Sequence, residues 1–220
     1  MAHKIERMEG LTPQVGSSPS KGIASRLWVA ARTEFSTRGY HGARVQGIAR
    51  RAGCNVALLY RHWASKRALY LEILKSIWVG NMEQINSLLG ESGGATGVVA
   101  AYLETRLADP EASQILIREY LDGGPFLTEL VASDPSVAAP VRGVAESLRS
   151  GNGHALRSGV DASMAVLTIG ALAALAAAAQ EAARPFLEPP GPTSDDWKRH
   201  ISDLLLHGLL GNGEQRLGPE

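Results

Sequence analysis

The sequence is poor in cysteine and in aromatic residues, and it has no net charge. Cys54 is the only cysteine among 220 residues, so the chain can form neither an internal disulfide nor a cysteine-rich metal site. Aromatic residues make up 5% of the chain, but hydrophobic residues make up 45%, which is too many for a disordered protein. Residues 1–20 lack the apolar run of a signal peptide, and we therefore expect a cytoplasmic protein.

The charges are distributed unevenly along the chain, although they sum to zero. Residues 21–75 contain 11 basic and two acidic residues, a net charge of +9, whereas residues 76–220 carry a net charge of −9. A strongly basic segment beside an acidic one is typical of a module that binds a polyanion such as nucleic acid. A solvated charged face that binds nothing gives the same distribution, so charge alone leaves both interpretations open.

Hydrophobic periodicity predicts an all-α protein behind a flexible arm at residues 1–20. The predicted helices are 21–39, 45–52, 56–62, 66–89, 96–108, 110–122, 125–150 with a break at 134–135, 162–187 and 194–210. Residues 162–179 contain no charge and approach the length of a membrane span, but many of them are small. A buried helix, covered in part by a second subunit, is the better interpretation, and we expect no membrane partner.

The predicted helices at 45–52 and 56–62 form a candidate helix-turn-helix motif. Gly53 supplies the turn between them, and Asn55 is expected to cap the second helix. The second helix of such a motif can enter the major groove of DNA. Many helix pairs with a glycine turn bind nothing, but here the basic surplus covers the same residues.

Several spaced residues in the segment 23–74 carry a family resemblance. They are Ile23-Ala24, Phe35, Gly39-Tyr40, Ile48-Ala49, Ala52-Gly53, Leu59-Tyr60, Trp63, Ser65-Lys66 and Leu69-Tyr70. This pattern resembles the DNA-binding domain of the tetracycline-repressor (TetR) family. The resemblance implies an N-terminal three-helix DNA-binding domain at residues 21–65 and a larger helical domain for ligand binding and dimerisation at residues 66–220.

The resemblance also implies a function. We expect a homodimer, held together through residues 162–187 and 194–210, that represses transcription from a palindromic operator on double-stranded DNA. An unidentified small-molecule effector in the larger domain would shift the helix at 66–89 and change the separation of the two recognition helices. Such a ligand releases DNA only if it binds the released conformation more tightly.

Ten residues are predicted to face DNA: Arg44, Gln46, Asn55, Val56, Ala57, Leu58, Tyr60, Arg61, His62 and Lys66. Tyr60 and Lys66 are expected to contact phosphates, and Arg61 is the candidate for a guanine edge or a phosphate. Gln46 matches a position from which some family members touch bases. Arg44 departs from the family, which usually has Ser or Thr at this position as a helix cap.

The recognition face offers few hydrogen-bonding groups. Val56, Ala57 and Leu58 are expected to lie on its exposed side, where they can make only apolar contacts such as those with thymine methyls. Specificity would then depend on few hydrogen bonds and on DNA shape.

Six residues beyond the basic segment are candidates for a ligand pocket, and the same residues suit an ordinary core: Trp78, Met82, Tyr102, Arg106, Tyr120 and Phe126. No cofactor is expected. His200 and His207 lie seven residues apart, but no further ligands at matching spacing accompany them, so no metal site is predicted.

Two other functions compete with the ligand-responsive repressor. One is a DNA-binding regulator that acts constitutively, without a ligand. The other is a helical enzyme or lipid carrier with an incidental basic segment, but the sequence has no nucleophile and base pair, paired carboxylates or phosphate-binding glycine loop at a recognisable spacing. We therefore expect that the protein is not an enzyme.

Overall fold

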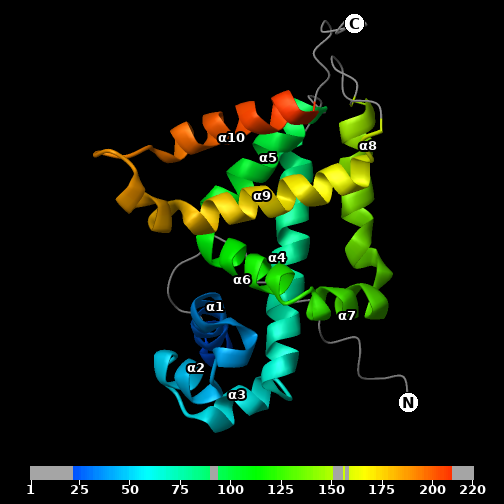
Figure 1. Cartoon of the computed structure of the whole chain (residues 1–220). Coiled ribbons are helices and arrows are strands. Elements are labelled where there is room, and N and C mark those ends of the chain that lie inside the picture. Colours follow the sequence, from blue (N-terminus) through cyan, green and yellow to red (C-terminus); the bar gives the residue numbers. More distant parts are fainter. Residues whose placement is uncertain (1–21, 90–93, 151–155, 157–158, 210–220) are drawn as a thin grey trace, which may run out of the picture. The chain divides into compact units, whose positions relative to one another are not determined.

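The computed structural model describes residues 22–89, 94–150, 156 and 159–209, and every regular element in that part of the chain is helical (Figure 1). The α-helices are α1 (Ile23–Gly42), α2 (Val45–Arg51), α3 (Val56–His62), α4 (Lys66–Leu89), α5 (Ala95–Ala108), α6 (Pro110–Leu121), α7 (Pro125–Ser133), α8 (Ala139–Ser150), α9 (Ala162–Ala183) and α10 (Ser194–Leu209). Short 3-10 turns occupy Pro135–Ala138 and Arg184–Phe186. The all-α prediction is confirmed.

The chain forms two compact units, which divide between Ser76 and Ile77 within α4. Residues 66–76 of α4 thus belong to the N-terminal unit, whereas the sequence placed a domain boundary at 65/66. The predicted arm at residues 1–20 lies outside the described residues.

Local sequence signals set most of the helix ends. The side chain of Asn55 accepts a hydrogen bond from the Leu58 amide at 3.0 Å, and the Ser65 hydroxyl accepts one from the Ala68 amide at 3.0 Å. These contacts cap α3 and α4 as predicted. Gly39, with φ of 66°, breaks the helical geometry of α1 where the sequence predicted its end, although the chain resumes a helical turn up to Gly42.

The break predicted near Asp134 is also present. The Asp134 carboxylate accepts a hydrogen bond from the Ser136 amide at 3.1 Å and caps the 3-10 turn that separates α7 from α8. The predicted helix end at Leu187 is wrong, because α9 stops at Ala183. Pro185 has no backbone N–H and its ring obstructs a continuing α-helix, so the chain changes there to a 3-10 turn.

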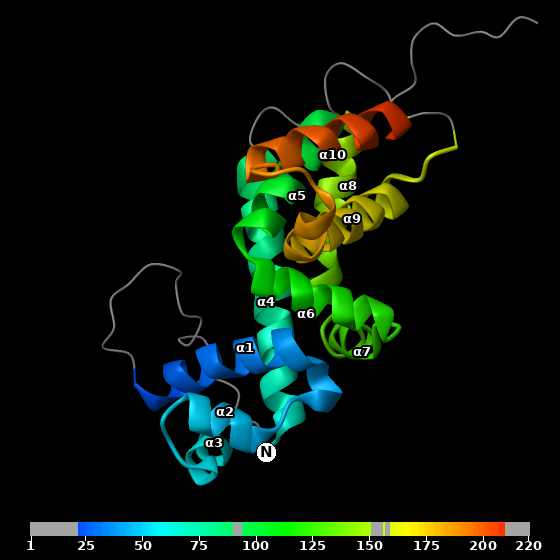
Figure 2. The ribbon, with the colours of Figure 1, turned by 60° about the vertical axis from the view of Figure 1, so that its left-hand side comes forward.

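The N-terminal unit is built around one aromatic centre. Phe35 of α1 is fully buried, and its ring centroid lies 4.9 Å from that of Tyr70 in an edge-on contact. Leu27, Ile48 and Leu59 complete the core at zero exposure. These side chains hold α1 against α2 and α3, which lie beside it in Figure 2.

In the C-terminal unit, α9 is the central helix. It packs against α5, α6 and α8, and α10 lies along α5 (Figures 1 and 2). Its buried side consists mostly of small residues, together with Val166 and Ile169, and the small residues allow the neighbouring helices to approach closely. At Gly170, for example, an added Cβ would lie 2.8 Å from a ring carbon of Tyr102.

The other side of α9 carries larger apolar residues that the described chain leaves exposed. Met164 is 70% exposed and Leu175 is 51% exposed, and Leu167 and Leu172 lie on the same side. We call these four residues the apolar stripe of α9. Residues 162–180 have a mean hydropathy of 2.0 and are long and apolar enough to cross a membrane by length and composition alone, and 44% of that window is buried against other helices.

Candidate nucleic-acid interface and effector pocket

The turn between α2 and α3 fixes the angle at which the two helices meet. Gly53 adopts a φ of 65°, which favours glycine, and the Cys54 amide donates to the Ala49 carbonyl at 3.0 Å. On its other side, α2 lies close to α1. A Cβ added to Gly47 would lie 2.7 Å from a carboxylate oxygen of Glu34. Both contacts hold the pair in a helix-turn-helix geometry.

One side of α3 is anchored in the unit, and this decides which residues face outward. Leu59 is fully buried and Trp63 is 8% exposed, and the indole Nε1 of Trp63 donates to Oε2 of Glu72 at 2.8 Å. Because these two residues point inward, Tyr60 and Arg61 turn to the surface. Tyr60 is 49% exposed, so its hydroxyl is accessible to a partner.

Five predicted DNA-facing side chains are exposed on α3 and at the start of α2. We call them the basic surface: Arg44, Gln46, Tyr60, Arg61 and His62. Asn55 and Ala57 are also exposed, and Asn55 is at the same time the cap of α3. No side-chain hydrogen bond caps α2 at Arg44, so the arginine that replaces the usual Ser or Thr does not take over its capping role.

Both acidic side chains of residues 21–75 are already engaged within the unit. Glu34 is 4% exposed and its Oε1 lies 3.2 Å from Nε of Arg38, while Glu72 accepts the bond from Trp63. Neither carboxylate is therefore free to neutralise the basic surface. An exposed positive field of this kind attracts phosphate backbones.

Lys66 has a structural role that the sequence did not reveal. Its Nζ donates to the Tyr40 carbonyl at 2.8 Å and to the Ala43 carbonyl at 3.1 Å, and it lies 4.4 Å from the centroid of the Tyr40 ring. Partial burial lowers the pKa of Lys66. The ammonium thus ties the start of α4 to the end of α1, and the third N–H of the ammonium is the one left for a phosphate.

The expected apolar recognition face is only partly exposed. Ala57 is exposed, but Val56 and Leu58 are half-buried. Periodicity could not show this, because α3 is a short helix packed into the unit on more than one side. The large side chains of α3 that are exposed are those of Tyr60, Arg61 and His62.

Four of the six predicted pocket residues lie near one another in the C-terminal unit, and the other two have separate partners. Met82, Tyr102, Arg106 and Tyr120 come together: the Tyr102 hydroxyl lies 3.8 Å from Sδ of Met82, and the Arg106 guanidinium lies 5.8 Å from the Tyr102 ring. Trp78 instead donates from Nε1 to the Val137 carbonyl at 3.0 Å.

The last of the six residues, Phe126, lies at the start of α7. It is half-buried, and its amide donates to the Glu119 carboxylate at 2.7 Å. Within the described residues, no three His, Cys, Asp or Glu side chains gather in a way that would hold a metal ion.

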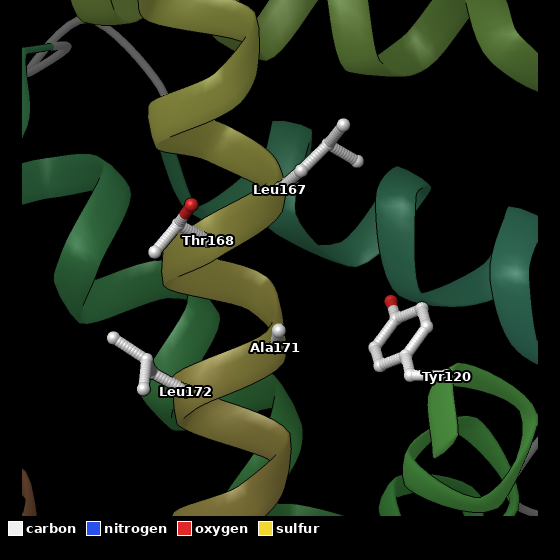
Figure 3. A pocket seen from close by; sticks show the side chains of 5 residues that line it. All are labelled: Tyr120, Leu167, Thr168, Ala171 and Leu172. Carbon is white, nitrogen blue, oxygen red and sulfur yellow. The ribbon is translucent and has the colours of Figure 1, made fainter. Parts of the chain in front are cut away.

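An open pocket of about 420 Å³ lies between α6 and α9 (Figure 3). Tyr120 lines it from α6, and the other lining residues are Leu167, Thr168, Ala171 and Leu172 of α9. Sequence reasoning named Tyr120 but missed the α9 residues, because it assigned that helix to the dimer interface. The uncharged run in α9 gave no sign of which residues line the pocket.

The N-terminal unit also matches a known family in sequence. The family model for bacterial regulatory proteins of the tetR family matches residues 27–73. The HTH-type transcriptional regulator RutR of Escherichia coli K12 is 30% identical over 137 residues, which is 61% of this chain and 63% of RutR. The chain therefore spans less than two thirds of the length of this curated relative.

Solved structures extend the likeness to both units at the level of the fold. The transcriptional regulator SCO4942 from Streptomyces coelicolor has a TM-score of 0.66 at 21% identity, covering 86% of this chain and 98% of that one. A regulator from Saccharomonospora viridis, solved in complex with choline, has a TM-score of 0.61 at 19% identity, covering 86% and 97%.

The fold and the exposed helix-turn-helix are similar to those of DNA-binding transcriptional regulators. Residues 27–73 match the model of the tetR family of bacterial regulatory proteins, and both units share the fold of solved transcriptional regulators, which supports a TetR-family regulator. Its relatives are transcriptional regulators, which are generally not enzymes.

Proposed function

We propose that the protein is a homodimeric repressor that binds a palindromic operator and is released from it by a small molecule. The observation that carries the proposal is the basic surface, which projects from a helix-turn-helix whose only two acidic neighbours are already engaged. Arg61 would read a base edge or bind a phosphate, and Tyr60, together with the remaining N–H of Lys66, would bind phosphates.

The apolar stripe of α9 supports the dimer. Met164 and Leu175, the two members of the stripe that do not line the pocket, are large apolar side chains that water solvates poorly, and the same two residues of a second copy would cover them. The proposed interface consists of α9 and α10. Two symmetric subunits present two recognition helices, and this symmetry requires a palindromic site.

The C-terminal unit supports a response to a small molecule. It contains an open pocket in the size range of ligand sites, and a neighbour of the same fold was solved with choline bound. Soluble, cytoplasmic action follows from the proposed partner, chromosomal DNA.

A selection of bound duplexes from random DNA tests the function. We expect it to return a palindrome whose half-site centres are separated by whole helical turns of about 10–10.5 bp each. Candidate small molecules are then added to the complex with the selected site, and release is followed by fluorescence anisotropy. Enrichment of no sequence would refute operator binding, whereas a bound palindrome that no effector releases would identify a constitutive regulator.

Removing the Tyr60 hydroxyl should weaken binding to all DNA sequences alike. Tyr60→Phe deletes one phosphate hydrogen bond, and we expect a loss of about tenfold, or roughly 1.4 kcal/mol, on both the selected site and random duplex. Arg61→Ala is the comparison variant, because loss of a base contact should relax preference at one position of each half-site. A Tyr60→Phe protein with altered base preference and unchanged affinity for random duplex would contradict this role.

A further inference from the structure

The most unusual buried group in the C-terminal unit is the guanidinium of Arg106. The residue is 1% exposed, and its Nε and Nη1 atoms are buried without a hydrogen-bond partner. Among the described residues it forms no ion pair. Arginine remains charged in proteins, so a full positive charge is held away from water with two of its three donor nitrogens unused.

The nearby carboxylates are engaged elsewhere. Asp109 accepts the Ala112 amide at 3.0 Å as the cap of α6, and Glu119, 2% exposed, accepts the Phe126 and Leu127 amides. Asp109 is within electrostatic reach of the Arg106 guanidinium but forms no ion pair with it, and the other neighbours of the guanidinium are aromatic and neutral. The ring of Tyr102 lies 5.8 Å away, and the hydroxyls of Tyr102 and Tyr120 are within electrostatic reach of the guanidinium.

Burial shifts the pKa values of Arg106, Tyr102 and Tyr120 in the direction that favours the neutral form of each. It lowers the pKa of Arg106 and raises the pKa of both tyrosines, so the tyrosines stay neutral and cannot supply the missing negative charge. The Tyr102 hydroxyl has only the thioether sulfur of Met82 as a partner, at 3.8 Å, and sulfur is a weak acceptor. The cluster therefore offers unused donors, and no carboxylate forms an ion pair with its guanidinium.

Tyr120 connects this cluster to the open pocket. It lines the pocket opposite Leu167 and Ala171 of α9 (Figure 3). It is also an electrostatic neighbour of Arg106. A ligand with one end at Arg106 would thus have apolar walls for its other end. No second cation joins the cluster in the described chain, so the site matches a single negative charge.

We propose that the effector site takes an organic monocarboxylate, whose carboxylate binds the Arg106 guanidinium and the hydroxyls of Tyr102 and Tyr120 and whose apolar body occupies the pocket against α9. The planar fork of arginine matches a carboxylate through two parallel hydrogen bonds. This inference rests on the proposed function, because it names the ligand class of the same pocket. A carboxylate oxygen that accepts a hydrogen bond from the Tyr102 hydroxyl would also end the contact of this hydroxyl with Met82. Because Met82 belongs to α4, the ligand would change the packing of that helix.

The test measures binding to the full-length protein without DNA. Thermal shift and calorimetric titration are run with a series from butanoate to decanoate and with benzoate, and the neutral amides of the same acids and inorganic phosphate serve as comparison ligands. We expect at least one carboxylate to raise the melting temperature and to bind at least tenfold more tightly than its amide. Equal effects of acid and amide, an equal effect of phosphate, or no effect of any acid would overturn the proposal.

Arg106→Met tests the residue itself. The substitution removes a buried charge that has no ion-pair partner and keeps an unbranched side chain. We therefore expect the ligand-free protein to be at least as stable as the wild type. Its affinity for carboxylates should fall at least tenfold. Arg106→Lys keeps the charge without the planar fork and should bind more weakly than wild type, whereas Arg142→Met, which removes an exposed arginine of α8, should bind as wild type. If Arg106→Met does not fold, carboxylate affinity is compared in Arg106→Lys and Tyr120→Phe instead. Unchanged affinity in the folded variants would refute the site.

The outcome separates this inference from the proposed function. A carboxylate that binds but leaves the operator complex intact would contradict ligand-relieved repression and retain the site. Operator release by neutral molecules alone would retain the repressor and refute the carboxylate site.

Discussion

Leu175→Asp is expected to convert the protein from a dimer into a monomer at micromolar concentration. Leu175 is 51% exposed on the apolar stripe of α9 and does not line the pocket, so the change should leave the effector site intact. In a symmetric interface the substitution places two unpaired carboxylates where the partner covers them, at a cost of several kcal/mol. Since each 1.4 kcal/mol is a factor of ten, we expect the dimer dissociation constant to rise by about a thousandfold.

Sedimentation analysis measures this effect directly. Operator affinity should fall with it, because a monomer loses the gain from two linked half-sites. Leu121→Asp is the matched control, since Leu121 is 81% exposed on α6, outside the stripe, and should remain dimeric. A Leu175→Asp protein that sediments as a dimer would place the interface elsewhere.

Phe35→Ala is expected to unfold the N-terminal unit and to abolish DNA binding while the C-terminal unit stays folded. Phe35 has zero exposure and packs on Tyr70, and truncating such a phenylalanine costs about 3–5 kcal/mol. A unit of this size has little stability to lose, whereas the C-terminal unit has its own core around α9.

Calorimetry should show the loss or strong lowering of one transition and the persistence of the other, with the dimer retained in sedimentation. Phe35→Leu fills much of the same space and should keep measurable operator affinity. One cooperative transition that moves as a whole in Phe35→Ala would show that the two units unfold together.

Local chemistry made much of the fold predictable from the sequence. Asn55, Ser65 and Asp134 cap the helices or turns that follow them, and the capping contact involves residues within three positions along the chain. Gly39 and Gly53 adopt positive φ values where the sequence required a break or a turn. For this reason, α3 and α4 begin and end where expected.

Periodicity failed where both sides of a helix are apolar. In α9 many alanines, together with Val166 and Ile169, face inward, whereas the methionine and the leucines face outward, and a uniformly apolar sequence contains no signal for that choice. The close packing of Tyr102 against Gly170 places the Gly170 side of α9 toward the core. The end of α9 was also misplaced, although Pro185 was a visible signal.

The sequence by itself determined the class of protein: helical, with a basic helix-turn-helix in a TetR-family pattern, because caps, turns and charge are properties of neighbouring residues. Only the tertiary structure decided what Lys66 and Arg106 do. Lys66 reaches carbonyls 23 and 26 residues away, and Arg106 loses its access to water when α5 packs against α6 and α9. The partners of a charge, and the free energy of burying it, depend on residues distant in the chain, and folding alone brings them together.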